Sequence, residues 1–468
     1  MSLLYERIAN SIGDLIQSGV YPPGTRLPSV RDLSQNRSVS VSTSVRVYHE
    51  LERRGSIESR PQAGFYVVGS TPLAGLPGTI DAVKQPMPVT GQDRIMRMLQ
   101  AVNDPAIVNF GAATPHPEFL PGVALERSYK KAWRSNRRRC LSQEFAPGCA
   151  ELRTQIARRL ASIQTFTRPE DILITNGCQE AVSIALRLVT QPGDVVAIES
   201  PTFYGLLEVI RGLGLRALEI PTSPESGLSL EALELAATEW SLKACVVIPN
   251  YSNPLGVSMS NDKKKRLIAM AEQFDFSIVE DDIYGEIPAK GNRLLPIKSW
   301  DDTGRVLYCS SATKTVSAGL RVGWLVPGAA NMARAIHLQY VSTISVETVG
   351  QLALAGYFSN GQVNRHMRRM AREYDHSRVH LLNEVEKLFP EGSRISRPSG
   401  GFVLWIELPG NIDTAELMNE ALEDGICFAP GTLFSASGRF TNCLRLNSAQ
   451  KWEPRIERAL VRLAKLIN

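Results

Sequence analysis

Residues 306–324 read VLYCSSATKTVSAGLRVGW, and this stretch indicates both a fold class and a chemistry. It opens with an apolar run typical of a buried strand, Val306–Ser310, and continues into small hydroxyl-bearing residues around Lys314. Arg321 follows shortly after the lysine. This combination suits a lysine that forms a Schiff base beside a guanidinium that binds phosphate. A lone loop lysine, however, is more often simply solvated.

Apolar runs of the same kind recur along the chain and alternate with helical stretches. The clearest are Ile172–Thr175, Val195–Ser200, Cys245–Pro249 and Ser277–Glu280. Nearly continuous apolar strands between helices predict a mainly parallel sheet that is buried on both faces. Ligands of such sheets bind beyond the carboxyl ends of the strands, so we expect the chemistry at the polar residues that follow each run.

Two polar segments follow these runs directly. In EDDIYG (280–285), Asp281 could keep a pyridine nitrogen protonated, and Tyr284 could reach a ring hydroxyl. TNGCQEA (175–181) joins a strand to a helix, whose first amides form a ready phosphate site. When the first segment is taken alone, an acidic loop and a packed tyrosine are the favoured explanation.

Two further segments supply groups that suit a flat ring. PTFYG (201–205) offers Phe203 for stacking, and NPLG (253–256) offers the amide of Asn253 for a hydrogen bond to a ring hydroxyl. Aromatic residues after strands more often belong to the core, so neither segment is decisive by itself.

The six segments occur in the order TNGCQEA, PTFYG, NPLG, EDDIYG, SSATK and RVGW. In this order the chain from about residue 93 to 468 resembles the fold-type I aminotransferases, which use pyridoxal 5′-phosphate (PLP). The resemblance implies that Lys314 is the catalytic residue that forms the internal aldimine with PLP. It also implies the remaining cofactor contacts: Asp281 at the pyridine nitrogen, Tyr284 and Asn253 at the ring hydroxyl, Phe203 stacked on the ring, and Cys178 and Gln179 (both through the backbone), Ser311 and Arg321 at the phosphate. Arg445 in NCLRL matches the arginine that binds a substrate carboxylate.

One position departs from the family pattern. Many members carry a tyrosine five residues before the glycine of a G-x-x-x-L-R segment, where it reaches the cofactor phosphate of the neighbouring subunit. Gly148 begins that segment here, and Gln143 stands at the spacing of the tyrosine. This cross-subunit contact is therefore in question.

The sequence pattern of roughly the first 70 residues is different and predicts three short helices and a hairpin. Ser29 and Ser40 are the expected N-caps of the second and third helices, and the helices are expected to end near Gly19, Gln35 and Gly55. β-type runs at Ile57–Arg60 and Phe65–Val68 follow them. Three helices followed by a hairpin form an α+β winged helix-turn-helix arrangement.

The segment RLPSVRDL (26–33) with VS at 39–40 resembles the GntR family of winged-helix transcription factors over about residues 3 to 68. The resemblance implies binding to a double-stranded DNA operator, with the helix after residue 40 in the major groove. We expect the following DNA-binding residues: Ser42, Thr43 and Arg46 toward the bases, Ser29 and Arg31 toward phosphates, and Gly64 at the wing tip. Any one of them alone would be equally well explained as a surface residue.

Composition limits the remaining possibilities. The chain has 468 residues, of which 43% are hydrophobic and 21% charged, so we expect two or more folded domains. Seven cysteines without a CxxC pair indicate reduced thiols, and the six histidines show no metal-ligand spacing with them. No apolar run reaches membrane-spanning length and no signal peptide is recognisable, so we expect a cytoplasmic protein without a membrane partner.

We therefore expect a multidomain protein in three parts. A GntR-type DNA-binding domain covers 1–69, a linker rich in Gly, Pro, Ser and Thr covers 70–92, and an α/β aminotransferase class I/II-like effector domain covers 93–468. A long surface loop within one domain is the alternative for the linker. A basic run at 130–139 is either a solvated helix face or an auxiliary DNA-contacting patch.

A GntR-like domain joined to an aminotransferase-like domain is the architecture of the MocR (GabR-like) transcription regulators. The resemblance spans nearly the whole chain. It implies a PLP-dependent DNA-binding regulator, homodimeric through its large domain, that senses a small amine or amino-acid effector, or PLP itself, through aldimine chemistry. An active PLP-dependent aminotransferase is the alternative, and a regulator with residual transaminase activity lies between the two. A regulator with a vestigial PLP pocket is a third possibility.

Overall fold

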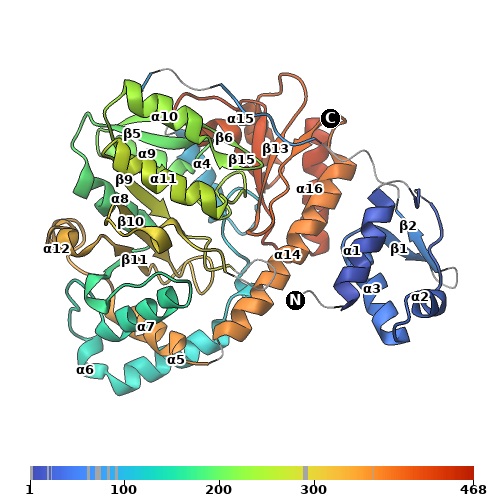
Figure 1. Ribbon diagram of the computed structural model, residues 1–468, viewed down its shortest axis with the longest axis horizontal. Coiled ribbons are helices and arrows are strands. Elements are labelled where there is room, and N and C mark those ends of the chain that lie inside the picture. Colours follow the sequence, from blue (N-terminus) through green and yellow to red (C-terminus); the bar gives the residue numbers. More distant parts are fainter. Residues whose placement is uncertain are drawn as a thin grey trace.

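The computed structural model places a small N-terminal unit beside a much larger α/β body (Figure 1). It describes residues 4–17, 20–22, 24–60, 64–68, 75–81, 85–89, 93–287, 293–361 and 363–468. Within these ranges, no helix combines the length and the apolar character needed to cross a bilayer.

The N-terminal unit, called the reader below, packs three helices against a two-stranded hairpin. Its elements are α1 (Leu4–Gln17), α2 (Val30–Asn36), α3 (Val41–Arg53), β1 (Ile57–Arg60) and β2 (Gly64–Val67). Val47, Tyr48 and Leu51 of α3 are fully buried in its core. This is the winged helix-turn-helix arrangement predicted from the sequence.

The ends of the reader helices agree with the predicted capping residues. Ser29 and Ser40 accept hydrogen bonds from the amides of Asp32 and Thr43, which satisfies amides in the first turns of α2 and α3. Gly55 follows the end of α3 with a φ of +69°, a left-handed conformation that favours glycine. The helix end predicted near Gly19 lies outside the described residues.

A mainly parallel eight-stranded sheet forms the centre of the large body. In spatial order its strands are β4 (Leu173–Thr175), β11 (Gly323–Val326), β10 (Val306–Ser311), β9 (Ser277–Asp281), β8 (Leu242–Val247), β5 (Val195–Ser200), β6 (Arg216–Ser223) and β7 (Gly227–Leu228). The strands from β10 to β6 run parallel, and β11 and β7 run antiparallel to their neighbours. The predicted α/β fold class is confirmed.

One predicted strand was placed wrongly. The apolar run Cys245–Pro249 was expected as a strand, whereas β8 spans Leu242–Val247. The exposed Lys243 interrupts the apolar pattern and hides the start of the strand. Pro249 has no amide hydrogen and cannot extend a ladder, so the chain leaves the sheet before it.

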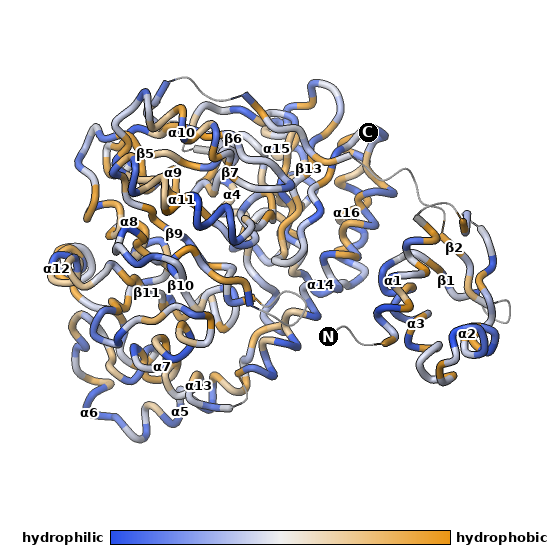
Figure 2. The backbone as a smooth tube through the Cα atoms, viewed as in Figure 1, coloured by the Kyte–Doolittle hydropathy of each residue, from blue (hydrophilic) through white to orange (hydrophobic). Residues whose placement is uncertain are grey.

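Helices cover both faces of this sheet, as Figure 1 shows. The helices of the large body are α5 (Gly122–Ser135), α6 (Arg137–Cys140), α7 (Ala150–Ala161), α8 (Cys178–Val189), α9 (Tyr204–Gly212), α10 (Leu230–Glu239), α11 (Asn261–Gln273), α12 (Met332–Ser342) and α13 (Thr348–Phe358). Short 3-10 turns are η1 (Pro117–Phe119), η2 (Pro169–Asp171), η3 (Ile297–Trp300), η4 (Ala329–Asn331) and η5 (Gly431–Phe434). In Figure 2 the tube of α13 is largely hydrophobic while α6 is hydrophilic, in keeping with the buried and exposed positions of these helices.

A second, smaller sheet near the C-terminus carries its own core. Its elements are β12 (Arg394–Ile395), β13 (Val403–Glu407), β15 (Ala429–Pro430) and β16 (Cys443–Asn447), flanked by α4 (Asp93–Val102), α14 (Val363–Leu388), α15 (Thr414–Glu423) and α16 (Pro454–Ile467). β3 (Val108–Asn109) pairs separately with β14 (Ile426–Cys427). Trp405, Phe428 and Leu444 are at the centre of this core.

Two described pieces of the expected linker are attached to the large body. The amide of Met87 donates to the Ala217 carbonyl of β6, and the Ala217 amide donates back, both at 2.9 Å. The amide of Gly78 donates to Glu407 Oε2 at 2.7 Å. The predicted linker bounds of 70–92 stay a prediction, but these contacts show where the segment is anchored.

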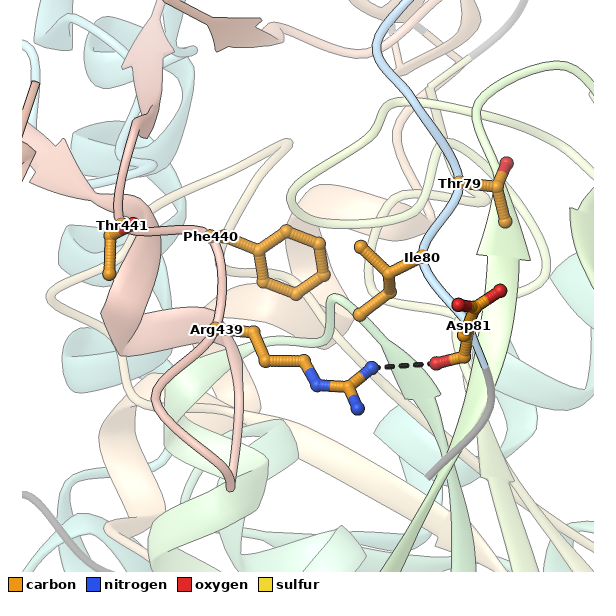
Figure 3. A pocket seen from close by; sticks show the side chains of 6 residues that line it. All are labelled: Thr79, Ile80, Asp81, Arg439, Phe440 and Thr441. Atoms are coloured by element: carbon orange, nitrogen blue, oxygen red, sulfur yellow. Dashed lines mark hydrogen bonds between the residues drawn. The ribbon is translucent and has the colours of Figure 1, made fainter. Parts of the chain in front are cut away.

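The same segment forms one wall of a surface pocket. Thr79, Ile80 and Asp81 face residues 439–441 across it, and Arg439 Nη1 donates to the Asp81 carbonyl at 2.6 Å (Figure 3). This pocket lies where the linker crosses the smaller sheet, away from the polar residues that follow the strands of the central sheet.

Candidate functional site

The structure brings the predicted site residues of the large body to the carboxyl edge of the central sheet. Asp281 ends β9, Ser311 ends β10, Lys314 and Tyr284 lie in the turns after these strands, Asn253 follows β8, Phe203 follows β5, Cys178 and Gln179 open α8, and Arg321 precedes β11. Arg445 comes from β16 of the smaller sheet. The site is therefore built between the two sheets.

Lys314 is half-buried and presents its amine toward the backbone of the segment after β3. Its Nζ donates to the Ala113 carbonyl at 2.6 Å and lies 5.8 Å from the centre of the Tyr284 ring. Burial and the nearby positive charges of Arg445 and Arg321 lower the pKa of Lys314 to about 8, against the opposing effect of Asp281. A substantial fraction of this amine is therefore neutral and nucleophilic near pH 8.

Asp281 is held by two hydrogen bonds to the same carboxylate oxygen. Its Oδ1 accepts from Cys178 Sγ at 3.2 Å and from the Ile283 amide at 3.1 Å. Burial raises the pKa of Asp281 to about 6, although these two bonds favour its charged form. Above that pH the group is a carboxylate that can stabilise a protonated ring nitrogen.

The adjacent Asp282 is committed to a different role. Its Oδ1 accepts from Asn250 Nδ2 at 2.7 Å, and its Oδ2 accepts from the Tyr308 hydroxyl at 2.9 Å. Asn250 Oδ1 in turn accepts from the buried Lys264 Nζ at 2.6 Å. Both oxygens of Asp282 are therefore engaged in this network. Asp281 is left as the carboxylate that faces the site.

The start of α8 and the Arg321 turn form a cradle suited to a phosphate. A Cβ on Gly323 would lie 2.4 Å from the Gly177 carbonyl carbon, and a Cβ on Gly177 would lie 2.6 Å from Arg321 Nη2. Arg321 has a φ of +53° and donates to the Asn176 carbonyl at 3.2 Å. Close backbone approach, a helix N-terminus and a guanidinium are the features of an anion site.

Ser311, which is also predicted at the phosphate, is fully buried. Its hydroxyl donates to Thr313 Oγ1 at 2.9 Å and accepts from the Thr313 amide at 3.3 Å. Gln179, predicted as a backbone contact, points its side chain to the Gly205 carbonyl at 2.5 Å. Its amide near the helix start remains available to a ligand by position.

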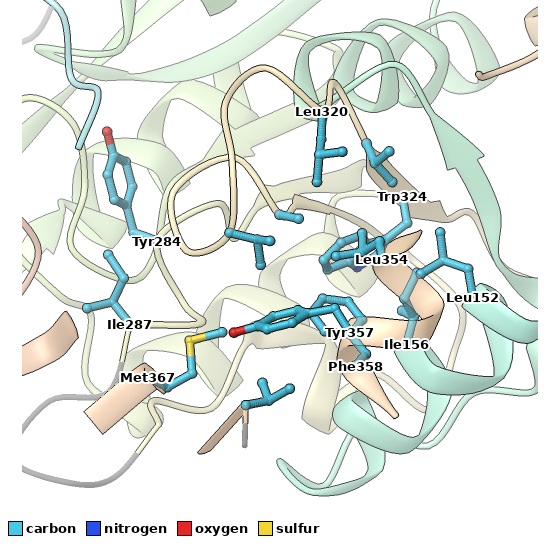
Figure 4. Close-up of a cluster of buried hydrophobic side chains, with 14 of the residues drawn as sticks. Leu152, Ile156, Tyr284, Ile287, Leu320, Trp324, Leu354, Tyr357, Phe358 and Met367 are labelled. Carbon is cyan, nitrogen blue, oxygen red and sulfur yellow. The ribbon is translucent and has the colours of Figure 1, made fainter. Parts of the chain in front are cut away.

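Tyr284 and Asn253 lie next to each other. Burial raises the pKa of the Tyr284 hydroxyl, and the neighbouring Asn253 side chain opposes this effect. Asn253 Oδ1 is buried and has no hydrogen-bond partner within the described residues. Figure 4 shows Tyr284 at the edge of the buried cluster, with its hydroxyl directed away from Ile287 and Met367.

Phe203 is placed by close packing at the start of α9. Its ring centre lies 4.7 Å from that of Tyr204, and a Cβ on Gly205 would approach Phe203 Cε1 to 2.4 Å. Glycine at 205 is therefore needed for this ring orientation. The half-buried ring stands beyond the end of β5, as a stacking residue requires.

Arg445 is a fully buried cation without an acidic partner in the described chain. Its Nη2 donates to the Gly111 carbonyl, and its Cζ lies 5.4 Å from the centre of the Phe434 ring. Nε and Nη1 have no hydrogen-bond partner within the described residues. Burial of unpaired donors is costly, so this arrangement fits a site that binds an anionic group such as a carboxylate.

These features fit PLP as the resident cofactor. The site offers an amine for the aldehyde, a carboxylate for the ring nitrogen, a phenol and an amide for the ring hydroxyl, and a cradle for the phosphate. The orphaned Asn253 oxygen and the glycine contacts at 177 and 323 are structural observations that such a ligand would explain.

Four of the predicted DNA-contacting residues, Ser29, Arg31, Ser42 and Arg46, are exposed on the reader. Ser42 and Arg46 are exposed in the first turns of α3, and Arg31 is exposed on α2. Thr43 is half-buried and bonded through its hydroxyl to Ser40 Oγ at 2.8 Å. Ser29 is engaged in a capping box with Asp32, so its hydroxyl has a local partner as well.

Gly64 begins β2 with a φ of +102°, and a Cβ there would lie 3.3 Å from Arg26 Nε. The residues before it, 61–63, lie outside the described chain, so the tip of the wing is not described. Arg26 is an exposed cation beside the wing that sequence reasoning did not assign as a contact. Its place at the start of the RLPSVRDL motif was the available signal.

Sequence reasoning also missed four contacts within the large body. The Cys178 thiol donates to Asp281, while only the backbone of Cys178 had been assigned. Tyr204 lies beside Arg445, whose charge opposes the rise that burial causes in the pKa of Tyr204. The carbonyls of Gly111 and Ala113 accept from the two cations of the site, and no side-chain pattern marks them.

Comparison with known proteins finds two family matches along the chain. Residues 128–463 match the family described as aminotransferase class I and II, and residues 4–67 match the bacterial regulatory proteins of the gntR family. The chain is 37% identical over 464 residues to the uncharacterized HTH-type transcriptional regulator YjiR of Escherichia coli, which covers 99% of this chain and 98% of that protein.

Solved aminotransferases are similar to the large body. The kynurenine aminotransferase of Pyrococcus horikoshii matches with a TM-score of 0.75 and 27% identity, over 81% of this chain and 95% of that one. The α-aminoadipate aminotransferase LysN of Thermus thermophilus, complexed with N-(5′-phosphopyridoxyl)-L-leucine, matches with a TM-score of 0.74 and 26% identity, over 80% and 94% respectively.

Proposed function

Because the chain belongs to the aminotransferase class I and II family and to the MocR (GabR-like) branch of the GntR regulators, we propose that it couples DNA binding to an amine-carboxylate effector. It is a GntR-type transcriptional regulator fused to a PLP-binding aminotransferase domain. The observation behind the proposed effector class is the buried Arg445 with its unpartnered donors, which enters the same site as Lys314.

PLP supplies an aldehyde that combines with amines and a ring that accepts electron density. The residues of this chain determine which amines are selected. Arg445 would bind the carboxylate of an effector, Lys314 would hold or accept a proton at Nζ, and Asp281 would keep the ring nitrogen protonated. If PLP itself is the effector, Lys314 and Asp281 would recognise it. Arg445 would then have a role other than binding an effector carboxylate.

We also propose a homodimer formed through the large body. Leu141, Phe145 and Ile344 are 71%, 55% and 45% exposed. Phe145 forms a β-bridge with Ser345, which is next to Ile344, and Leu141 lies four residues before Phe145 in the chain. A cluster of exposed apolar side chains is typical of an interface between subunits. Gln143, at the spacing of the cross-subunit tyrosine, is exposed in the same loop.

A dimer with one reader per chain would bind two half-sites in an operator, and such a regulator would act in the cytoplasm. The test uses purified full-length protein loaded with PLP. Footprinting of the region upstream of its own gene should show protection. The protein is then titrated with single amino acids and with the matching amines that lack the carboxyl group. Only the amino acids should change the PLP absorbance and the footprint.

An active aminotransferase is the second candidate, because the complete set of Lys314, Asp281 and Arg445 is present. Steady multi-turnover transfer of an amino group from a common amino acid, with no protected DNA in any upstream region, would favour the enzyme and refute the regulator.

A further inference from the structure

Helix α14 contacts both halves of the protein. It is 26 residues long, or about 39 Å at the usual rise per residue, and it passes between the central sheet and the reader (Figure 1). On its inner face, His366 Nε2 donates to the Thr315 carbonyl at 3.0 Å, and the Tyr374 hydroxyl donates to the Lys314 carbonyl at 2.9 Å. The backbone of the cofactor lysine is thus bonded to this helix.

A chain of aromatic rings forms a second connection between the site and Tyr374. The ring centres of Tyr284 and Phe402 are 5.4 Å apart, and those of Phe402 and Tyr374 are 5.0 Å apart, both edge to face. These three side chains are at most 2% exposed. Close-packed interiors transmit displacement because they leave no space to absorb it.

The next residue along α14 contacts the reader. Asp375 Oδ2 accepts from Arg53 Nη1, at the end of α3, at 3.0 Å. Asp375 also accepts from Arg378, which is anchored on the Pro398 carbonyl. Within the parts of the chain that the structure describes, this is the ion pair that joins the reader to the large body.

The reader and α14 also approach each other closely beside this ion pair. A Cβ on Gly55 would lie 2.4 Å from Asn383 Nδ2, and its φ of +69° already favours glycine. The C-terminal end of α3 therefore rests on α14, while the first turns of α3 carry the expected base contacts.

We propose that Tyr374 and Asp375 form a latch on α14 that transmits the state of the PLP site to the DNA-reading helix. Adjacent helix residues point about 100° apart, so one can face the interior while the other faces the reader. When the loop around Lys314 is ordered, its carbonyl fixes the position of Tyr374. The neighbouring Asp375 is then fixed as well and keeps its ion pair with Arg53. The inference rests on the function proposed above and specifies its route of regulation.

The expected effect is modest. The side chains of Arg53 and Asp375 are 37% and 41% exposed. Exposed pairs change an equilibrium by about fivefold at most, which suits a contact that must open and close. The latch is closed when Arg53 and Asp375 are paired. Because the two equilibria are linked, PLP binding favours the closed latch by the same factor by which closing the latch strengthens PLP binding.

Hydrogen exchange of the full-length protein tests the latch, with PLP itself as the probe. In the wild type, adding PLP to the apoprotein should slow exchange in the last turn of α3, residues 50–54, by about two- to fivefold. In Asp375→Asn and in Arg53→Gln this turn should exchange fast with and without PLP, and the double variant should add nothing further. Glu373→Gln, which removes an exposed acid two residues away on α14, should behave as the wild type.

Tyr374→Phe separates the two ends of the latch. It keeps the ring contacts but loses the bond to the Lys314 carbonyl, so PLP should still bind while its effect on α3 diminishes. A PLP response that persists unchanged in Asp375→Asn overturns the latch and leaves the regulator intact. A wild type that binds neither PLP nor DNA overturns the proposed function, and the latch with it.

Discussion

Replacing Arg445 by methionine should abolish effector recognition and, at the same time, make the effector-free protein more stable. The guanidinium is fully buried, and its Nε and Nη1 lack partners within the described chain. Each unsatisfied buried donor costs about 1–3 kcal/mol, so removing two of them gains about 2–6 kcal/mol. The lost charged bond to the Gly111 carbonyl costs about 1.5–3 kcal/mol. At the midpoints of these ranges the net expectation is a stabilisation of about 2 kcal/mol.

Binding should change in the opposite direction. An amino acid would lose two charge-assisted hydrogen bonds of about 1.5–3 kcal/mol each, which corresponds to at least a hundredfold weaker binding. The matching amine without a carboxyl group should bind Arg445→Met as it binds the wild type. This comparison separates the carboxylate contact from general damage to the pocket.

The assay combines thermal unfolding of the effector-free protein with titrations of a matched amino acid and amine, followed by PLP absorbance. Arg445→Lys, which keeps the charge but not the planar fork, should recover little affinity and no stability. A variant that unfolds at a lower temperature than the wild type would show that the unpartnered donors are satisfied in solution. A variant that still distinguishes the acid from the amine would remove Arg445 from the effector site.

The remaining predictions concern the cofactor and the DNA. Burial lowers the pKa of Lys314 to about 8, so its amine is increasingly protonated below that pH. The rate at which the apoprotein captures PLP, followed by absorbance, should therefore rise up to about pH 8 and then level off. A capture rate that does not change from pH 6 to 10 would contradict this environment of Lys314. Lys314→Ala should retain no PLP after borohydride reduction, and peptide mapping that located PLP on another lysine of the wild type would refute the assignment. Asp281→Asn should weaken PLP binding by about ten- to a hundredfold, because a charged hydrogen bond to the cofactor is lost. Asp282→Asn should mainly lower the unfolding temperature, because the oxygens of Asp282 accept hydrogen bonds from Asn250 and Tyr308. Arg46→Ala should cost about 1–3 kcal/mol of operator binding and relax one base position, with PLP loading unchanged; equal weakening on all sequences with a flatter salt dependence would make it a phosphate contact.

Much of the fold follows from local patterns in the sequence. Capping serines at 29 and 40, the apolar runs before polar strand ends, and the order of six short segments predicted the reader, the parallel sheet and the candidate site residues. Such signals are local, because a cap, a strand end or a helix N-terminus is formed by residues within a few positions of one another. The β8 strand was misplaced because the exposed Lys243 broke the apolar run on which its prediction depended.

Other features were decided by the tertiary structure alone. The bond from Cys178 to Asp281, the position of Arg445 against the Gly111 carbonyl and the pairing of Arg53 with Asp375 join residues about 100 to 330 positions apart. No periodicity links such residues, because their contact depends on how separately folded elements pack. Sequence alone determined which side chains were available at each strand and helix end. Packing decided which of them meet, since a hydrogen bond or ion pair needs its partners within about 3 Å, a distance that only the assembled layers set.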